Sequence, residues 1–275
     1  EDHLDYYRDL AEIQESFRVF AARVPDSGAI VVNDAYAPLF ADDPRIQGRL
    51  VTYGFAQEAD WRCHDPVPAT AGQRFLVEHR GQPVGEISLP MFGRHNALNA
   101  TGALAALVAA GLAPEEAIAG LDAFQGVGRR LEPVASVGGI DLLDDYGHHP
   151  TEIRAVVRAL RQRFEDRRLI VVFQPHQASR TRCLMKDFAA ALAEADEVWM
   201  PPIYFSRDSE EERRAVTSAD LARHVENEGG HATTLEDLPA VVEHALAHLR
   251  DGDVLVTMGA GNVDEVAHGL AQRLR

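Results

Sequence analysis

Several features are scarce in this chain of 275 residues, and each absence excludes a class of protein. Only two cysteines occur, Cys63 and Cys183, and their wide separation argues against a disulfide framework or a zinc cluster. No run of about 18 apolar residues is present, so the sequence predicts no membrane span. No charged and then apolar leader opens the chain, and a cytoplasmic setting fits best. The chain begins without methionine inside a helical pattern, which suggests a fragment.

Positive charge is also scarce. The chain has 27 basic and 43 acidic residues, and its formal net charge is −16. This balance disfavours general binding to nucleic acid or to an anionic membrane, but it is compatible with a local basic site for a phosphate. Lysine occurs once, at Lys186, so arginine supplies nearly all of the positive charge. The hydrophobic content of 46% allows a sizeable core in one large or two ordinary domains.

The densest group of functional side chains is Asp-Asp-Tyr-Gly-His-His-Pro-Thr-Glu, residues 144–152. An apolar run before it predicts a buried strand, and the apolar spacing after it, in residues 153–164, predicts a helix. Turns of this kind lie at the carboxyl ends of parallel strands, where ligands bind. Pro150 cannot extend a strand pairing, and Thr151 is predicted to be the N-cap of the helix. A polar capping connection is the simpler interpretation, but it does not need so many acids, histidines and aromatic rings.

The order of strands and helices predicts a two-lobed α/β fold. The first lobe begins with an amphipathic helix and parallel strands at residues 29–33 and 50–53, followed by an antiparallel flap at 74–79 and 84–89. The second lobe is predicted to be a doubly wound, Rossmann-like sheet. Its strands are expected at residues 140–144, 169–173, 197–200, 231–234 and 254–258, with helices near 151–164, 182–194, 218–226, 238–249 and 263–274. The glycines of residues 125–132 mark the predicted boundary, which gives domains 1–128 and 129–275.

Two short motifs have the chemistry to bind a nucleotide. Asn96 and Asn99 lie one turn apart at the start of a helix that is apolar almost all round and predicted to be buried. A carboxamide both donates and accepts hydrogen bonds, which suits a purine edge, although helix capping is an alternative. Arg129 and Arg130 follow two glycines, and an arginine there can hold a phosphate with two hydrogen bonds. A surface arginine pair beside Glu132 is the alternative.

Three further stretches are candidate sites. The loop at residues 173–182 combines His176 with arginines that include Arg180. Residues 259–261, Gly-Ala-Gly, precede a helix and could bind an anion at its N-terminus, but such a turn is weak evidence alone. His3 stands between two aspartates and could bind a divalent cation, whereas the simpler interpretation is an acid-rich helix start.

These motifs, taken in order, closely resemble those of the Mur ligases. The matching pieces are residues 2–5, Gly93 to Asn96 with Asn99, residues 124–130, 144–152, 173–176 with 179–181, and 259–261. The resemblance covers essentially the whole chain. It is strongest to the branch of the family that joins L-alanine to UDP-N-acetylmuramate.

The resemblance implies a mechanism and a role for each motif. ATP phosphorylates the muramate carboxylate to an acyl phosphate, which the amine of L-alanine then attacks, and cations must bring the two anions together. By the same resemblance His3 is a Mg²⁺ ligand, and Asn96 and Asn99 contact the adenine. Arg130, or with less support Arg129, binds the γ-phosphate, and Asp145 contacts the ribose or nucleotide with Tyr146 and His148 beside it. His176 and Arg180 belong to the amino-acid site.

The chain departs from the family pattern at two places. Many members have arginine and tyrosine where Gln177 and Ala178 stand, so a role for these positions is in doubt. The family's phosphate loop, Gly-Thr-His-Gly-Lys-Thr, is absent, because Lys186 has no glycine loop before it. With the loop, an upstream metal-binding glutamate and the UDP-binding domain are also missing. The chain is therefore interpreted as the remainder of a P-loop-type ATPase domain followed by the amino-acid-binding domain, and by itself it is predicted to be inactive.

Other functions are considered beside this one. The sibling Mur ligase that recycles whole peptides onto the same sugar nucleotide is an alternative, which the loop from His176 to Arg180 disfavours. A non-catalytic module that binds a nucleotide or an amino acid is another. A Rossmann-type oxidoreductase would need a Gly-x-Gly-x-x-Gly turn after an early strand, and none is found. The expected partners are small molecules, namely UDP-N-acetylmuramate, L-alanine and ATP, with no nucleic acid and no membrane, and the oligomeric state stays open.

Overall fold

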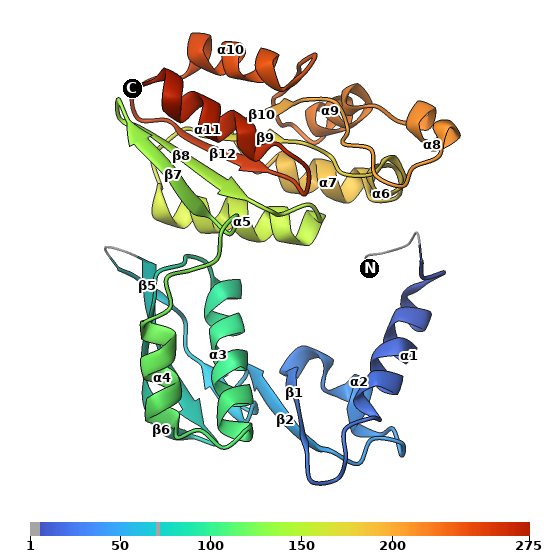
Figure 1. Cartoon of the computed structure of the whole chain (residues 1–275), viewed down its shortest axis with the longest axis vertical. Coiled ribbons are helices and arrows are strands. Elements are labelled where there is room, and N and C mark those ends of the chain that lie inside the picture. Colours follow the sequence, from blue (N-terminus) through green and yellow to red (C-terminus); the bar gives the residue numbers. More distant parts are fainter. Residues whose placement is uncertain (1–5, 70–71) are drawn as a thin grey trace. The chain divides into compact units, whose positions relative to one another are not determined.

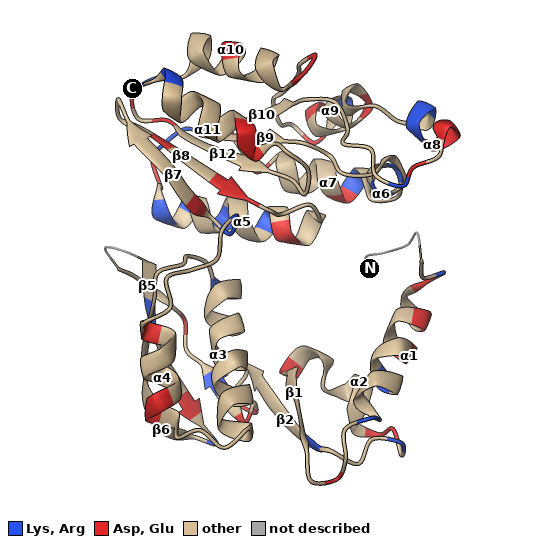
Figure 2. Cartoon of the chain, in the orientation of Figure 1, with Lys and Arg blue, Asp and Glu red and all other residues tan. Residues whose placement is uncertain are grey.

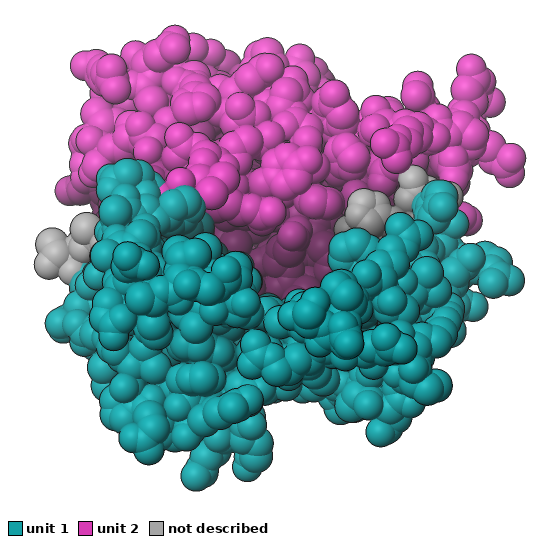
Figure 3. Space-filling model, turned by 60° about the horizontal axis from the view of Figure 1, so that its bottom comes forward, with its two compact units in different colours: residues 1–125 teal, residues 126–275 magenta. Residues whose placement is uncertain are grey.

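The computed structural model of the chain describes residues 6–69 and 72–275. The chain divides into two compact units, residues 1–125 (unit 1) and residues 126–275 (unit 2), which Figure 3 colours separately. Each unit has one β-sheet and its own helices, so the predicted α/β class with two lobes is confirmed. Among the described residues, none of the helices is long and apolar enough to cross a membrane.

The sheet of unit 1 combines a parallel part with an antiparallel part (Figure 1). The parallel strands are β1 (Ala29–Asn33), β2 (Arg49–Gly54) and β3 (Trp61–Cys63), and the antiparallel strands are β4 (Val67–Ala69), β5 (Gly72–His79) and β6 (Gln82–Leu89). Their order is β1-β2-β3-β5-β4, and β6 pairs with β5. The predicted parallel strands and antiparallel flap are therefore confirmed, whereas β4 was not predicted.

The helices of unit 1 are α1 (Leu10–Ala21), the 3₁₀ turn η1 (Asp34–Tyr36), α2 (Pro38–Ala41), α3 (Arg94–Ala109) and α4 (Pro114–Asp122). α3 and α4 pack on the sheet, where Leu104 joins Trp61, Phe75 and Ile87 in the core. The prediction that this helix is buried holds for only one face of α3. Ala103 and Leu107, on its other face, are exposed. Apolar residues are common on protein surfaces, so an apolar sequence does not by itself show burial.

The sheet of unit 2 is the doubly wound sheet that the sequence predicted. Its strands are β7 (Glu132–Val137), β8 (Ile140–Asp145), β9 (Leu169–Phe173), β10 (Glu197–Met200), β11 (Ala232–Thr234) and β12 (Val254–Met258), in the order β11-β10-β9-β12-β8-β7. All neighbours are parallel except β7, which pairs antiparallel with β8 and was not predicted. β9 and β12 are buried along their whole length, as expected for strands covered on both faces.

Helices cover both faces of this sheet. They are α5 (Pro150–Arg163), α6 (Ala178–Cys183), α7 (Met185–Leu192), α8 (Glu210–Ala215), α9 (Ser218–Asn227), α10 (Leu238–His248) and α11 (Asp264–Arg273). Figure 1 shows α10 and α11 on one face and α5 and α7 on the other, and the first pair closes a core around Trp199 and Leu255.

One prediction for the helices of unit 2 needs correction, and one further helix was not predicted. The single helix expected at residues 182–194 is two helices, α6 and α7, which meet at Leu184 with a non-helical backbone. α8 was also not predicted, and its first turn is stabilised because Ser209 and Glu212 cap each other. Figure 2 shows acidic and basic residues next to each other on α8, as its sequence Glu-Glu-Glu-Arg-Arg-Ala requires.

Candidate ligand site at the strand ends of unit 2

The motifs of unit 2 meet because their strands end in register. Met258 at the end of β12 pairs with Asp145 at the end of β8 and with Phe173 at the end of β9. The loops that follow β8, β9 and β12 therefore leave the same edge of the sheet. This is the edge at which doubly wound sheets bind ligands, and the predicted position of the two histidine-containing turns at strand ends is confirmed.

The predicted site residues of unit 2 lie close together at this edge. The ring of His148 is 5.3 Å from that of Tyr146 and 6.2 Å from that of His176, measured between centroids. Arg180 Nη1 is 3.2 Å from His176 Nδ1. A guanidinium has no acceptor, so His176 Nδ1 must accept this hydrogen bond and the imidazole proton sits on Nε2. We call these four residues, with Arg130 above the Tyr146 ring at 5.7 Å, the strand-end cluster.

The turn between β8 and α5 is held by its own helix cap. His149, rather than the predicted Thr151, is the N-cap of α5, and its side chain accepts a hydrogen bond of 3.3 Å from the backbone N–H of Thr151. Glu152 Oε2 accepts hydrogen bonds from the backbone N–H groups of His148 and His149, at 3.0 and 3.2 Å. The prediction was wrong because Pro150 occupies the first helical position, which moves the cap back to the preceding residue. The cap fixes the backbone that carries His148.

The two adjacent arginines have different surroundings. Arg129 Nε donates to Asp144 Oδ2 at 2.9 Å, and its two Nη atoms donate to the carbonyl oxygens of Gly261 and Gly259 at 3.0 and 2.8 Å. The side chain of Arg130 is 44% exposed, and its ion pair with Glu152 is longer, at 3.8 Å. Arg129 therefore has a structural role, because its hydrogen bonds join the end of β8 to the turn after β12. Arg130 is the arginine whose donors can reach a ligand.

The two aspartates at the end of β8 are buried, and both contribute to holding the edge together. Asp144 Oδ1 accepts a hydrogen bond of 2.6 Å from the Thr257 hydroxyl, and burial raises the pKa of Asp144 above its ordinary range. Asp145 accepts hydrogen bonds from the backbone N–H groups of Leu131 and Gly147, at 2.8 and 2.7 Å. Burial raises the pKa of Asp145 to about 6, even though these hydrogen bonds act to lower it. Its visible role is to fix the backbone beside Arg130 and Tyr146.

Sequence reasoning missed two residues at this edge. Tyr204, in the loop after β10, stacks on His176, with centroids 5.6 Å apart and planes 11° apart. Gln174, at the end of β9, is buried, and among the described residues its Oε1 has no hydrogen-bond partner. Gln174 belongs to the Phe-Gln-Pro-His motif and could have been singled out there. Nothing in the sequence pairs Tyr204 with His176, because the contact joins two loops 28 positions apart.

The asparagine pair of unit 1 is only partly as predicted. Asn96 is buried in the first turn of α3, and its Nδ2 donates to the carbonyl oxygen of Phe92 at 2.8 Å. Asn99, one turn later, is exposed. The backbone of Gly93, just before α3, is in turn held by Gln73 Nε2, which donates to its carbonyl oxygen at 2.9 Å. These hydrogen bonds fix the start of α3. The Asn96 side chain is bonded to the turn before the helix, whereas the Asn99 side chain is exposed to solvent.

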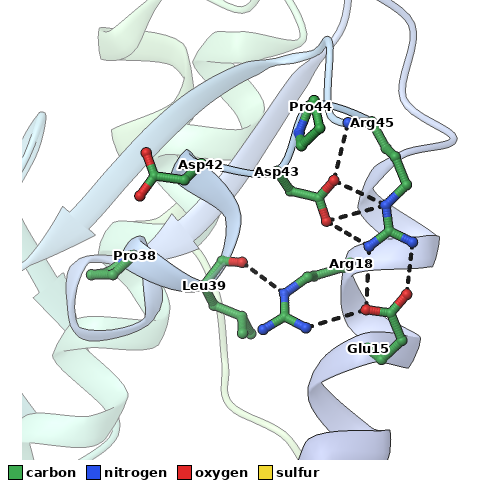
Figure 4. Close-up of a pocket in the computed structure, with 8 residues that line it drawn as sticks. All are labelled: Glu15, Arg18, Pro38, Leu39, Asp42, Asp43, Pro44 and Arg45. Carbon is green, nitrogen blue, oxygen red and sulfur yellow. Dashed lines mark hydrogen bonds and ion pairs between the residues drawn. The ribbon is translucent and has the colours of Figure 1, made fainter.

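Unit 1 also has a charged hollow of about 490 Å³ beside α1 and α2 (Figure 4). Arg45 donates to Asp43 and to Glu15, both at 2.6 Å, and Arg18 donates to Glu15 at 3.2 Å. Figure 4 shows these side chains pointing at one another, so the charges neutralise each other within the protein. We interpret the hollow as a surface ion-pair network, which is a weaker candidate for a ligand site than the strand-end cluster.

The predicted metal ligand, His3, lies outside the described residues. Within residues 6–69 and 72–275 no group of three or more histidine, cysteine, aspartate or glutamate side chains is arranged to hold a metal ion.

A doubly wound domain that gathers arginines, histidines and a tyrosine at its strand ends has the features of an enzyme for anionic substrates. Comparison with protein families agrees. The Mur ligase middle domain matches residues 1–107, and the glutamate ligase domain of the Mur ligases matches residues 129–261. These two matches account for most of the chain. The chain belongs to the Mur ligase family.

Among curated proteins, the chain is similar to enzymes named UDP-N-acetylmuramate–L-alanine ligase. It is 37% identical to the enzyme of Geotalea uraniireducens over 100% of the chain and 43% identical to that of Acidothermus cellulolyticus over 94% of it. It spans 59% and 55% of the lengths of these relatives. Among solved structures, the UDP-N-acetylmuramate-alanine ligase of Thermotoga maritima has a TM-score of 0.73 at 25% identity, over 99% of this chain and 57% of that one.

Proposed function

We propose that this chain works as part of an enzyme that joins L-alanine to the carboxylate of UDP-N-acetylmuramate at the expense of ATP, in the synthesis of peptidoglycan precursors. The observation that carries the proposal is the strand-end cluster, in which Arg130, His148, His176 and Arg180 lie at one sheet edge. Membership of the Mur ligase family and the names of the curated relatives support it. Because the chain spans little more than half of those relatives, the proposal concerns the protein as a whole.

The proposed chemistry passes through an acyl phosphate. The muramate carboxylate attacks the γ-phosphorus of ATP, and ADP leaves. The amine of L-alanine then attacks the acyl carbon, phosphate departs with one oxygen of the original carboxylate, and the amine loses a proton. Both steps bring negative charges together, so guanidinium groups in a fixed position lower the barrier.

Each residue of the cluster has a proposed role in this reaction. Arg130, with its exposed donors, binds the transferred phosphoryl group, and Arg180 pairs with the carboxylate of L-alanine. His176 presents its Nε2 proton as a hydrogen-bond donor, and His148 lies beside it as a second imidazole. Tyr146 offers its ring to the nucleotide, and Asp145 supports it by holding the backbone of Gly147. Direct contact of Asp145 with the nucleotide would require its buried carboxylate to be uncovered.

The remaining proposals concern the nucleotide and the metal. The exposed carboxamide of Asn99 and the buried one of Asn96 are proposed to recognise adenine, for which their donor and acceptor atoms are suited. Mg²⁺ is proposed to accompany ATP, with His3 as one ligand. The sequence contains no glycine-rich loop ending in lysine, so the chain alone is predicted not to catalyse ligation.

The test is an assay of ADP release by the full-length protein. We expect release to require both UDP-N-acetylmuramate and L-alanine. R130A should lower kcat about 10²- to 10³-fold, the usual cost of losing a donor to developing charge. R180A should raise the KM for L-alanine with little change in the KM for ATP.

R214A is the control, because Arg214 is an exposed arginine of α8 that pairs only with Glu210 among the described residues. If ADP release were independent of L-alanine, or as fast with R130A as with R214A, the proposal would be wrong. A panel with whole peptides in place of L-alanine tests the recycling activity.

A further inference from the structure

The ring of His176 is held in one plane by two neighbours. Tyr204 stacks on its face with centroids 5.6 Å apart, and Arg180 Nη1 donates to its Nδ1 from the edge, at 3.2 Å. A hydrogen bond fixes the direction of one ring atom, but the ring can still tilt about that bond. A stacked aromatic neighbour prevents this tilt. The direction in which the Nε2 proton points therefore depends on Tyr204.

The backbone around Tyr204 is paired with the loop that carries His176. The N–H of Tyr204 donates to the carbonyl oxygen of Pro175 at 2.8 Å, and the N–H of Gln177 donates to the carbonyl oxygen of Tyr204 at 3.0 Å. Asp208 extends the pairing, since its carboxylate accepts hydrogen bonds from the N–H groups of Ala178 and Ser206, at 2.9 and 3.1 Å. The position of Tyr204 relative to His176 is thus set by main-chain hydrogen bonds.

The Tyr204 ring also packs tightly against the glycine-rich turn after β12. A Cβ atom added at Gly261 would lie 2.7 Å from two ring carbons of Tyr204 and 2.6 Å from Gln174 Oε1, so a larger residue there would displace these side chains. The same turn is clamped through its carbonyl oxygens by Arg129. The turn on which the Tyr204 ring packs is therefore held in place. Tyr204 is nevertheless 40% exposed, which is unusual for a ring that serves only to fill a core.

We propose that Tyr204 is a positioning residue of the amino-acid site, which holds the His176 ring at the angle needed to bind the amino-acid substrate, and that Gly261 is required to seat it. This inference rests on the proposed function, because it takes His176 and Arg180 to be residues that contact the amino acid. Tyr204 acts through His176 and makes no part of the covalent chemistry.

The test uses the full-length protein and compares the KM for L-alanine with the KM for ATP. Y204A should raise the KM for L-alanine about fivefold, the scale of one lost aromatic contact, and leave the KM for ATP unchanged. Y204F keeps the stacked ring and should restore the wild-type value. G261A should displace the ring and reproduce the effect of Y204A, whereas G120A, where an added Cβ meets nothing within 4 Å, is the matched control.

A double variant separates positioning from general damage. In the H176A background, adding Y204A should raise the KM for L-alanine no further, because the tyrosine then has no ring to position. Equal effects of Y204A with and without His176, or an unchanged KM for L-alanine in Y204A, would overturn the inference. An equal rise in the KM for ATP would also overturn it. If the wild-type protein itself fails to consume ATP in the presence of L-alanine, the proposed function is what has failed.

Discussion

Units 1 and 2 differ in how completely they bury their apolar residues. β9 and β12 of unit 2 are buried at every position, whereas every residue of β1 in unit 1 remains partly accessible. On α1 the large side chains Phe17 and Phe20 are 57% and 69% exposed. Unit 2 therefore supplies its own core on both sheet faces, and that core fixes the loops of the strand-end cluster. The candidate residues of unit 1 depend on one helix start, that of α3.

The two tryptophans allow this difference to be measured. Trp61 is buried in unit 1 and Trp199 in unit 2, so a W61F or W199F background reports on one unit at a time. The fluorescence of the remaining tryptophan during urea unfolding then gives the free energy of unfolding of that unit.

The largest expected effect compares a phenylalanine in each unit. Phe188 of α7 is 1% exposed and packs 5.4 Å from the ring of Phe173, so F188A should lower the free energy of unfolding seen by Trp199 by about 3–5 kcal/mol. F20A should change the value seen by Trp61 by less than about 0.5 kcal/mol, because Phe20 is already in water. A large loss from F20A would show that α1 is packed as tightly as α7 and would remove the contrast.

The next effect compares the two adjacent arginines of unit 2. R129A leaves Asp144 buried without its cation and frees two carbonyl oxygens of the glycine turn, at a cost of about 3 kcal/mol. R130A, the control, removes a long ion pair and should cost less than about 1 kcal/mol. The measurement is urea unfolding followed by Trp199. Similar losses from the two variants would contradict the interpretation that Arg129, and not Arg130, holds the ends of β8 and β12 together.

Arg129 and Arg130 also show which features of the site could be predicted from the sequence and which could not. The alternation of strands and helices predicted the sheet of unit 2, and the order of its strands then brought residues 144–152 to the same edge as His176. The family resemblance favoured Arg130 for the γ-phosphate, but nothing in the sequence predicted that Arg129 binds Asp144 and the glycine turn. Both arginines follow the same two glycines, and only their three-dimensional partners distinguish them. Tyr204 was missed for the same reason. The N-cap at His149 was predictable in principle, since proline at the first helical position moves the cap to the residue before it.

A further effect is the pH dependence that Asp145 gives to unit 2. Burial raises its pKa from 3.8 to about 6 on folding, so the folded protein binds this proton more tightly than the unfolded chain. The contribution of Asp145 to stability is then fully present below pH 3.8 and is lost as the pH rises to about 6. The D145N variant has no ionisable group at this position and does not lose stability in this way as the pH rises. Its free energy of unfolding relative to wild type should therefore rise by roughly 2–3 kcal/mol between acid and neutral pH. A constant difference would mean that folding does not shift the pKa of Asp145.

The smallest effect concerns the exposed ion pairs of unit 1. R45A removes the arginine that links Asp43 and Glu15 in Figure 4, yet the unfolding midpoint reported by Trp61 should hardly move. Added salt should reduce even that small change, because the pairs are open to solvent. A large, salt-independent loss would show that this network holds α1 in place and that unit 1 is more tightly organised than its exposed phenylalanines indicate.

We propose that the strand-end cluster serves amide formation through an acyl phosphate. The most direct test gives the full-length protein ATP, L-alanine and UDP-N-acetylmuramate labelled with ¹⁸O at both oxygens of its lactyl carboxylate, and analyses the products by mass spectrometry. Transfer through an acyl phosphate should leave one ¹⁸O atom in each phosphate released, with ADP and the alanyl product in equal amounts. Release of AMP, or phosphate without label alongside the alanyl product, would contradict it.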